Sequence, residues 1–236
     1  MIEIIFSLLT LILLEAVLGI DNLVFIAIIS SRLPTNQQKK ARRTGLLLAW
    51  VTRLLLLSLA YFIILLTHPL FTIYGFKVSW HDLFLLGGGL FLLAKGTHEI
   101  HTEMEVAGNP KNIQHIKSGF TWVIFQIALF DIIFSLDSIL TAVGLTQRYW
   151  VMATAITIAI FIMLLASEPL SRFINQHPTV KILALSFVLL IGVMLIADGL
   201  HYHIPRGYIY FAVCFSLLVE ILNNLISKRK KRIREQ

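Results

Sequence analysis

Charged residues are scarce in this sequence. Asp, Glu, Lys and Arg make up 14% of its 236 residues, against about 25% in an ordinary soluble domain. Apolar residues reach 57%, and several runs approach the roughly 20 residues that a helix needs to cross a hydrocarbon core about 30 Å thick. This composition excludes an ordinary soluble domain and predicts one polytopic membrane domain.

Cysteine is almost absent, because Cys214 is the single one. One thiol can form neither a disulfide nor a thiolate metal cluster within a chain. The N-terminus lacks the basic segment and the cleavage site of a secretory signal, so we expect residues 4–30 to remain as the first span. The sequence also lacks a nucleophile beside a base and a helical H-E-x-x-H zinc motif, which argues against an enzyme.

Basic residues outnumber acidic ones by 20 to 13, yet they form no single patch. They gather in short segments between apolar runs, so we expect no nucleic-acid binding. The positive-inside rule then places the N-terminus outside and the C-terminus inside. The expected fold class is an all-α polytopic membrane protein with seven transmembrane helices, at about residues 4–30, 44–66, 82–98, 121–145, 149–168, 181–200 and 207–226.

The two halves of the chain carry related segments. The segment "GLFLLAKGTHE" matches "GVMLIADGLHY", which aligns Gly89 with Gly192 and Gly96 with Gly199. A three-span unit ends on the opposite side from its start, so its copy enters inverted, as in many secondary transporters. We therefore expect a single transmembrane domain that consists of repeat one (about 4–98), a cytoplasmic connection (about 99–120), repeat two (about 121–200), a seventh helix (about 207–226) and a basic cytoplasmic tail (227–236).

Acidic residues occur where a membrane helix rarely holds them. The segment "LEAVLGIDNLVF" contains Glu15 and Asp21, and "LFDIIFSLDSIL" contains Asp131 and Asp137 at the same spacing. Insertion scales assign each buried Asp a cost of about 2.5 to 3.5 kcal/mol, so these acids must face protein or water rather than lipid. Acids placed in this way predict an ion pathway.

Polar neighbours share helix faces with two of these acids. A step of seven residues returns to nearly the same face of a helix, which aligns Glu15 with Asn22 and Asp131 with Ser138. The second acid of each pair then lies off that face. We expect local unwinding near Gly19 to bring the second acid of the first span back toward the site.

Carboxylates, an amide and a hydroxyl are hard oxygen ligands, which suit Mg²⁺, Ca²⁺ or Mn²⁺. No His or Cys lies in these two spans, so zinc and copper are disfavoured. The alternative is that the acids are protonated and join the helices by hydrogen bonds without binding an ion. The candidate metal ligands are Glu15, Asp21, Asn22, Asp131, Asp137 and Ser138.

Three other charged residues are candidates for supporting roles. Arg53, deep in the second apolar run, is the expected counter-charge. We favour a fixed salt bridge to one acid over a tethered cation that fills the site when metal leaves. Asp198 and Glu168 lie near the ends of the sixth and fifth spans and are candidate exit or entry residues, although a solvated span end also explains them.

Two short motifs are given structural interpretations. The "HEIHTEME" segment at 98–105 is a candidate cytosolic metal sensor or collecting funnel, but we favour a solvated loop face. The "LLGGGLF" segment at 85–91 lies inside a span, so it predicts close helix packing rather than a phosphate loop.

The sequence resembles the TerC family of integral membrane proteins over nearly its whole length. The resemblance rests on "LEAVLGIDNLVFIAIIS", "KKARRTG", "FDIIFSLDSILTAVGL" and "IADGLHYHIPRGYIYFAVCFSLLVEILN". It implies a seven-span inverted-repeat bundle that exports Mn²⁺, with the two acidic motifs as its site. Family members also have tellurium-resistance roles. The second motif has Asp131 and Ser138 where the first has Glu15 and Asn22, so the two half-sites are chemically unequal.

Together these features predict a secondary transporter that exports Mn²⁺ across the bacterial plasma (inner) membrane by alternating access, with proton uptake as a candidate drive. Ca²⁺ and Mg²⁺ remain open as substrates. We expect no permanently bound cofactor, and we expect membrane lipids, the divalent cation and either a second copy or envelope proteins as partners. The alternative is a membrane scaffold in a tellurite or envelope stress-resistance complex.

Overall fold

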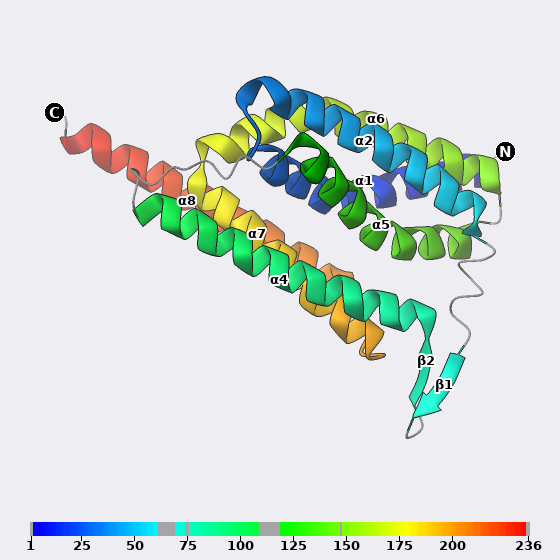
Figure 1. The fold of residues 1–236 in the computed structure, drawn as a ribbon. Coiled ribbons are helices and arrows are strands. Elements are labelled where there is room, and N and C mark those ends of the chain that lie inside the picture. Colours follow the sequence, from blue (N-terminus) through cyan, green and yellow to red (C-terminus); the bar gives the residue numbers. More distant parts are fainter. Residues whose placement is uncertain (1, 61–68, 74–75, 109–118, 147, 235–236) are drawn as a thin grey trace.

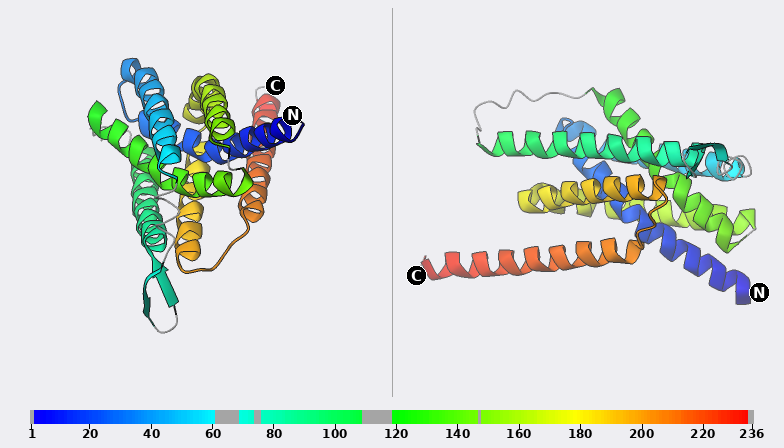
Figure 2. Two further views of the ribbon diagram at one scale, coloured as in Figure 1. Left: turned by 90° about the vertical axis from the view of Figure 1, so that its right-hand side faces the viewer. Right: turned by 90° about the horizontal axis from the view of Figure 1, so that it is seen from below.

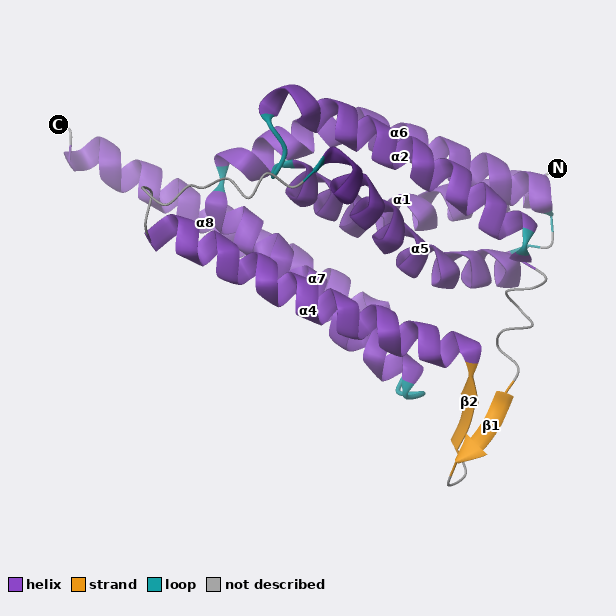
Figure 3. Cartoon of the chain, viewed as in Figure 1, coloured by secondary structure: helices purple, strands orange, loops and turns teal. Residues whose placement is uncertain are grey.

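The computed structural model describes residues 2–60, 69–73, 76–108, 119–146 and 148–234. Within these residues the chain forms seven helices and one β-hairpin (Figures 1 and 3). The helices are α1 (Ile2–Ser30), α2 (Thr35–Ser58), α4 (Trp80–Gly108), α5 (Phe120–Leu145), α6 (Tyr149–Gln176), α7 (Pro178–Gly199) and α8 (Arg206–Arg234), and the strands are β1 (Pro69–Ile73) and β2 (Phe76–Ser79).

Five helices in the described part of the chain are long and apolar enough to cross a membrane: α1, α4, α5, α6 and α7. This confirms the prediction of a helical polytopic fold. The prediction of seven membrane spans is not established, because five helices meet the length and hydropathy that a span needs. Helix α2 begins with the polar segment "TNQQKKARRTG", and its apolar sequence runs on into 61–68, which lies outside the described residues. The apolar part of α8 is shorter, at Gly207–Glu220.

Helix α4 is longer than the sequence predicted. It continues to Gly108, so the expected connection at 99–120 is wrong over its first ten residues. Hydropathy marks only the part of a helix suited to lipid, whereas this helix continues into polar residues. Pairs one turn apart stabilise the extension, such as Lys95 with Glu99 at 2.9 Å and His101 with Glu105 at 3.0 Å. Residues 109–118 lie outside the described part.

The expected external connection after the second span contains an antiparallel hairpin that the sequence analysis did not predict. Thr72 pairs with Lys77 and Ile73 with Phe76, and the register shifts near Pro69. The aromatic and β-branched residues of "LFTIYGFKVS" around a glycine are the signal for it.

A capping box joins the hairpin to α4. Ser79 at the end of β2 accepts a hydrogen bond from the Asp82 amide through Oγ at 3.1 Å, and Asp82 Oδ2 accepts one from the Ser79 amide at 2.8 Å. This reciprocal arrangement satisfies two backbone donors at the helix start. It fixes where the strand ends and α4 begins.

The helices form two groups (Figure 2). In the four-helix group, α1 packs on α6, and α2 packs on α5 and α6. In the three-helix group, α4 packs along α7, and α7 contacts α8.

Glycines bring α4 and α7 into close contact. A Cβ atom at Gly89 would lie 2.6 Å from the carbonyl oxygen of Gly192, and a Cβ atom at Gly192 would lie 3.0 Å from the carbonyl oxygen of Gly89. A side chain at either glycine would therefore collide with the backbone of the other helix. The prediction that "LLGGGLF" serves helix packing is confirmed.

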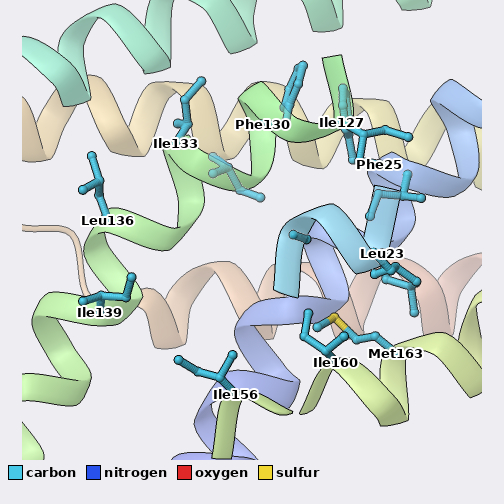
Figure 4. Close-up of a cluster of buried hydrophobic side chains, with 14 of the residues drawn as sticks. Leu23, Phe25, Ile127, Phe130, Ile133, Leu136, Ile139, Ile156, Ile160 and Met163 are labelled. Carbon is cyan, nitrogen blue, oxygen red and sulfur yellow. The ribbon is translucent and has the colours of Figure 1, made fainter. Parts of the chain in front are cut away.

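The main apolar core lies mostly in the four-helix group and extends into α4 and α7 through Leu85, Leu92 and Ile191. Figure 4 shows Leu23 and Phe25 of α1 beside Phe130 of α5 and Met163 of α6. Helix α1 is continuous through Gly19, so the predicted unwinding is wrong. The glycine instead allows close packing, because a Cβ atom there would lie 2.6 Å from the sulfur of Met163.

Candidate functional site

Arg53 joins the two acidic helices inside the four-helix group. Its Nη1 donates to Glu15 Oε2 on α1 at 2.8 Å. Its Nε and Nη2 both donate to Asp131 Oδ1 on α5, at 3.1 and 2.8 Å. Arg53 therefore bridges both acids, where the sequence analysis favoured a salt bridge to one.

Three polar side chains complete the surroundings of Asp131. Asn22 Nδ2 lies 3.4 Å from its Oδ1, and the hydroxyls of Thr52 and Ser135 each lie 3.3 Å from its Oδ2. Sequence reasoning missed Thr52 and Ser135. Ser135 follows Asp131 by one helical turn, which is a readable signal, whereas Thr52 gave no comparable signal beyond its position next to Arg53.

The triad of Glu15, Arg53 and Asp131 is sealed from solvent. The exposed fractions of these residues are 1%, 2% and 3%. Because these groups are buried, the charges need one another and their polar neighbours for compensation. With all three groups ionised, two carboxylates and one guanidinium leave a net charge of −1 at this position.

Two buried oxygens on α1 have no hydrogen-bond partner among the described residues: Glu15 Oε1 and Asn22 Oδ1. Leaving a buried acceptor unsatisfied costs about 1 to 3 kcal/mol. Both belong to side chains that the sequence analysis placed on one face of α1. Acceptor oxygens without donors are the groups that a hard cation would coordinate.

The remaining predicted metal ligands are Ser138, Asp21 and Asp137. Ser138 is buried on α5, donates to the Ser135 carbonyl at 3.2 Å and also has a side-chain hydrogen-bond interaction with Glu15, so it belongs to the surroundings of the triad. The side chains of Asp21 and Asp137 lie outside the described part of the structure. Among the described residues, no three His, Cys, Asp or Glu side chains are grouped as a preformed metal site.

The two candidate entry and exit residues lie apart from the triad. Glu168 on α6 pairs with Lys39 of α2 at 3.0 Å and with Arg172 at 2.8 Å. Asp198 is partly buried in the last turn of α7. Near it, His201 Nε2 lies 3.2 Å from Asp82 Oδ2 and links the ends of α7 and α4.

The acids of the "HEIHTEME" segment are paired with bases on α4 itself and on neighbouring elements. Glu99 contacts Lys95 and Arg32, and Glu103 contacts Lys181 of α7. The segment is helical, so the interpretation as a loop face is wrong. These ion pairs occupy the carboxylates that a metal sensor would require.

Comparison with known proteins assigns this chain to a family. The sequence profile described as "Integral membrane protein TerC family" matches residues 2–235. The chain belongs to the TerC family. The resemblance seen in the sequence motifs is thereby confirmed.

Several relatives in this family come from Escherichia coli (strain K12). The UPF0053 inner membrane protein YoaE is 49% identical over 98% of this chain, but the match covers 44% of YoaE. The UPF0053 protein YegH is 48% identical over 96% of this chain and 43% of its own length. The chain thus spans less than half of these two relatives.

A third relative is similar in length. The UPF0053 inner membrane protein YgdQ is 47% identical, and the match covers 93% of this chain and 92% of YgdQ. No solved structure matches the chain. Five membrane-capable helices and relatives named as inner membrane proteins make this TerC-family chain a multi-pass protein of the bacterial inner membrane.

Proposed function

We propose that this chain is a secondary transporter that exports a divalent cation, with Mn²⁺ as its substrate, through a site between α1 and α5. The observation that carries the proposal is the sealed triad, in which Arg53 bridges Glu15 and Asp131. Intramembrane ionisable groups that face the interior of a bundle are typical of ion pathways.

The donor set favours a hard divalent cation. Glu15 Oε1 and Asn22 Oδ1 accept no hydrogen bond from the described residues, and both are oxygen ligands. With all three groups ionised, the triad carries a net negative charge. We propose that cation binding satisfies these oxygens and offsets this charge. Mn²⁺, Ca²⁺ and Mg²⁺ all accept such ligands, and the family resemblance favours Mn²⁺.

Contacts between α4 and α7 support the inverted-repeat arrangement. The alignment of Gly89 with Gly192 also pairs Gly96 with Gly199 and Leu86 with Leu189. A Cβ atom at Gly96 would lie 2.7 Å from Leu189, and one at Gly199 would lie 2.9 Å from Leu86. The two contacts exchange under the repeat relation, as a pseudo-two-fold axis between inverted repeats requires.

The packing of the other helices follows the same relation. If α1 corresponds to α5 and α2 to α6, the α1–α6 pair corresponds to the α5–α2 pair. Both pairs are among the extensive contacts of the four-helix group. We therefore propose two inverted repeats, α1–α2–α4 and α5–α6–α7, followed by α8. The proposal includes seven membrane crossings, with the N-terminus outside and the C-terminus inside.

Protons are the proposed counter-ion. A carboxylate binds metal when it is ionised and loses metal when it is protonated, so acidification at the site weakens cation binding. Arg53 then holds Glu15 and Asp131 between transport events, when no cation is bound. The proposal requires no resident cofactor and no enzymatic step, and it needs only membrane lipids and the cation as partners.

Binding of Mn²⁺ to the purified protein tests this proposal. We expect saturable binding that weakens roughly 10-fold or more in Asp131→Asn and Glu15→Gln, which alter charges at the site. Glu105→Gln is the matched control, because Glu105 is exposed and, among the described residues, pairs with His101 on its own helix. Equal affinities in all four proteins, or no binding to folded wild type, would overturn it and favour the scaffold role.

A further inference from the structure

The four-helix and three-helix groups share the main core, where Phe91 of α4 packs on Phe130 of α5, and they also meet at a small apolar cluster near one end of the bundle. Ala27 and Ile28 of α1 contact Val180 and Leu185 of α7, and Ile100 of α4 packs against the same cluster. The positive-inside rule places this end in the cytoplasm, because α1 ends and α7 begins there beside Lys and Arg residues. The cluster closes the cytoplasmic side between the groups.

A buried carboxylate lies at this junction. Glu99 of α4 is 1% exposed and has two cationic partners. Lys95 lies one turn earlier on the same helix, with its Nζ 2.9 Å from Glu99 Oε1. Arg32, in the turn after α1, donates to Glu99 Oε2 from the other group. Glu99 therefore has one partner that belongs to its own helix and one that belongs to the opposite group.

This double pairing distinguishes Glu99 from the other acids at the same end of α4. Glu103 pairs with Lys181 of α7, which belongs to its own three-helix group. Glu105 pairs with His101 of its own helix. Of the three, Glu99 alone crosses between the groups among the described contacts.

Beside the junction, the groups are less closely packed. An apolar groove lies between α1 and α6 of one group and α7 and α8 of the other, and it is lined by Ile20, Val24, Leu170, Phe187, Ile191 and Leu217, among others. Side chains on the two sides of this groove therefore do not interlock fully.

We propose that the Arg32–Glu99 ion pair is the cytoplasmic gate of the transporter, with Lys95 as the residue that makes its opening reversible. The inference rests on the proposed alternating-access function. Removing one partner of a buried ion pair normally leaves an uncompensated charge at high cost. Lys95 moves with Glu99, so the carboxylate stays paired when Arg32 withdraws.

The proposal gives opposite effects for the two cations. Without Lys95, Glu99 depends on Arg32 alone, and the population of the closed state increases. Without Arg32, Glu99 keeps its pairing with Lys95, but the two groups lose the ion pair that links them. The population of the open state therefore increases. A residue that only supports the fold would not move this equilibrium in two directions.

Distances between spin labels on the two groups test the gate. Labels at Asn36→Cys on α2 and Met104→Cys on α4, both at exposed positions, would be placed in a Cys214→Ser background. We expect Arg32→Gln to move the closed-to-open ratio toward the longer distance by roughly fivefold or more, and Lys95→Gln to move it toward the shorter distance. Glu103→Gln and Glu105→Gln are matched controls that should leave it unchanged.

The measurement is made without substrate, so it does not depend on whether Mn²⁺ is transported. Lys95→Gln leaves the link between the groups intact and tests the proposal even if Arg32→Gln folds poorly. Shifts of the same sign in both variants, shifts no larger than those of the controls, or a single distance in every protein would overturn the gate.

Discussion

Arg53 donates two hydrogen bonds to one oxygen of Asp131, from Nε at 3.1 Å and from Nη2 at 2.8 Å. The other oxygen of Asp131 lies within reach of the Thr52 and Ser135 hydroxyls. Glu15 receives a single bond from Arg53 and keeps Oε1 without a partner in the described structure. Arg53 therefore binds the two carboxylates unequally, with two hydrogen bonds to Asp131 and one to Glu15.

Replacement of Arg53 tests the role of the bridge in stability. Arg53→Met leaves Glu15 and Asp131 buried without their cation, and losing one partner of a buried pair costs about 3 to 5 kcal/mol. We expect a strong fall in the melting temperature of the detergent-purified protein. The triple variant Arg53→Met, Glu15→Gln, Asp131→Asn should recover part of it, since no charge is left unpaired. A triple variant less stable than Arg53→Met would contradict this assignment.

Asn22 tests the open oxygens of α1. Asn22→Ala removes the amide oxygen that has no partner and a weak contact to Asp131, so we expect Mn²⁺ affinity to fall on the order of 10-fold with little change in melting temperature. Titration with Mn²⁺ measures this. Asn175→Ala, at an exposed position on α6, is the control. Equal affinities for the two variants would remove Asn22 from the site.

The sequence predicted the helices better than their ends. Hydropathy located the apolar centre of each helix, but it could not show that α4 continues to Gly108 or α6 to Gln176, because polar ends are stabilised by pairs such as Glu168 with Arg172. The hairpin was missed because its signal is alternation rather than apolar length. A search for side chains that alternate with a period of two residues would have predicted the hairpin.

The site was partly predictable for a related reason. The repeated spacing of acids in two spans indicated that Glu15 and Asp131 form related half-sites, and Arg53 was the one base deep within an apolar run. Which oxygens Arg53 contacts depends on how three helices are rotated against one another. That rotation depends on packing such as Gly45 of α2 against Ile127 of α5, which the local sequence does not encode.

The consecutive glycines of α4 give a matched series for the contact with α7. A Cβ atom at Gly89 would meet backbone, whereas one at Gly87 would meet nothing within 4 Å. We expect Gly89→Ala to destabilise the protein by about 1 to 3 kcal/mol, as overpacking does. Gly87→Ala should be neutral or stabilising, by up to about 1 kcal/mol from helix propensity. Melting temperatures of both variants decide it, and a Gly89→Ala protein as stable as Gly87→Ala would refute the close crossing.

The capping box at the start of α4 has a measurable contribution. Ser79→Ala removes the acceptor for the Asp82 amide, and we expect a loss of about 1 kcal/mol in the free energy of unfolding. Ser186→Ala is the control, because Ser186 is exposed and, within the described part of the chain, bonds to the Ile182 carbonyl one turn earlier. If both variants have the same melting temperature, the capping box does not stabilise the hairpin–helix junction.

The most direct test of the transport proposal is Mn²⁺ flux into proteoliposomes that contain the purified protein, with and without an imposed pH gradient. The account predicts flux that responds to the gradient and is lost in Asp131→Asn, while Glu105→Gln retains it. Asp21→Asn and Asp137→Asn should also abolish flux, as the paired acidic motifs predict. Absence of flux of Mn²⁺, Ca²⁺ or Mg²⁺ from well-folded wild type, or full activity of Asp131→Asn, would contradict the account.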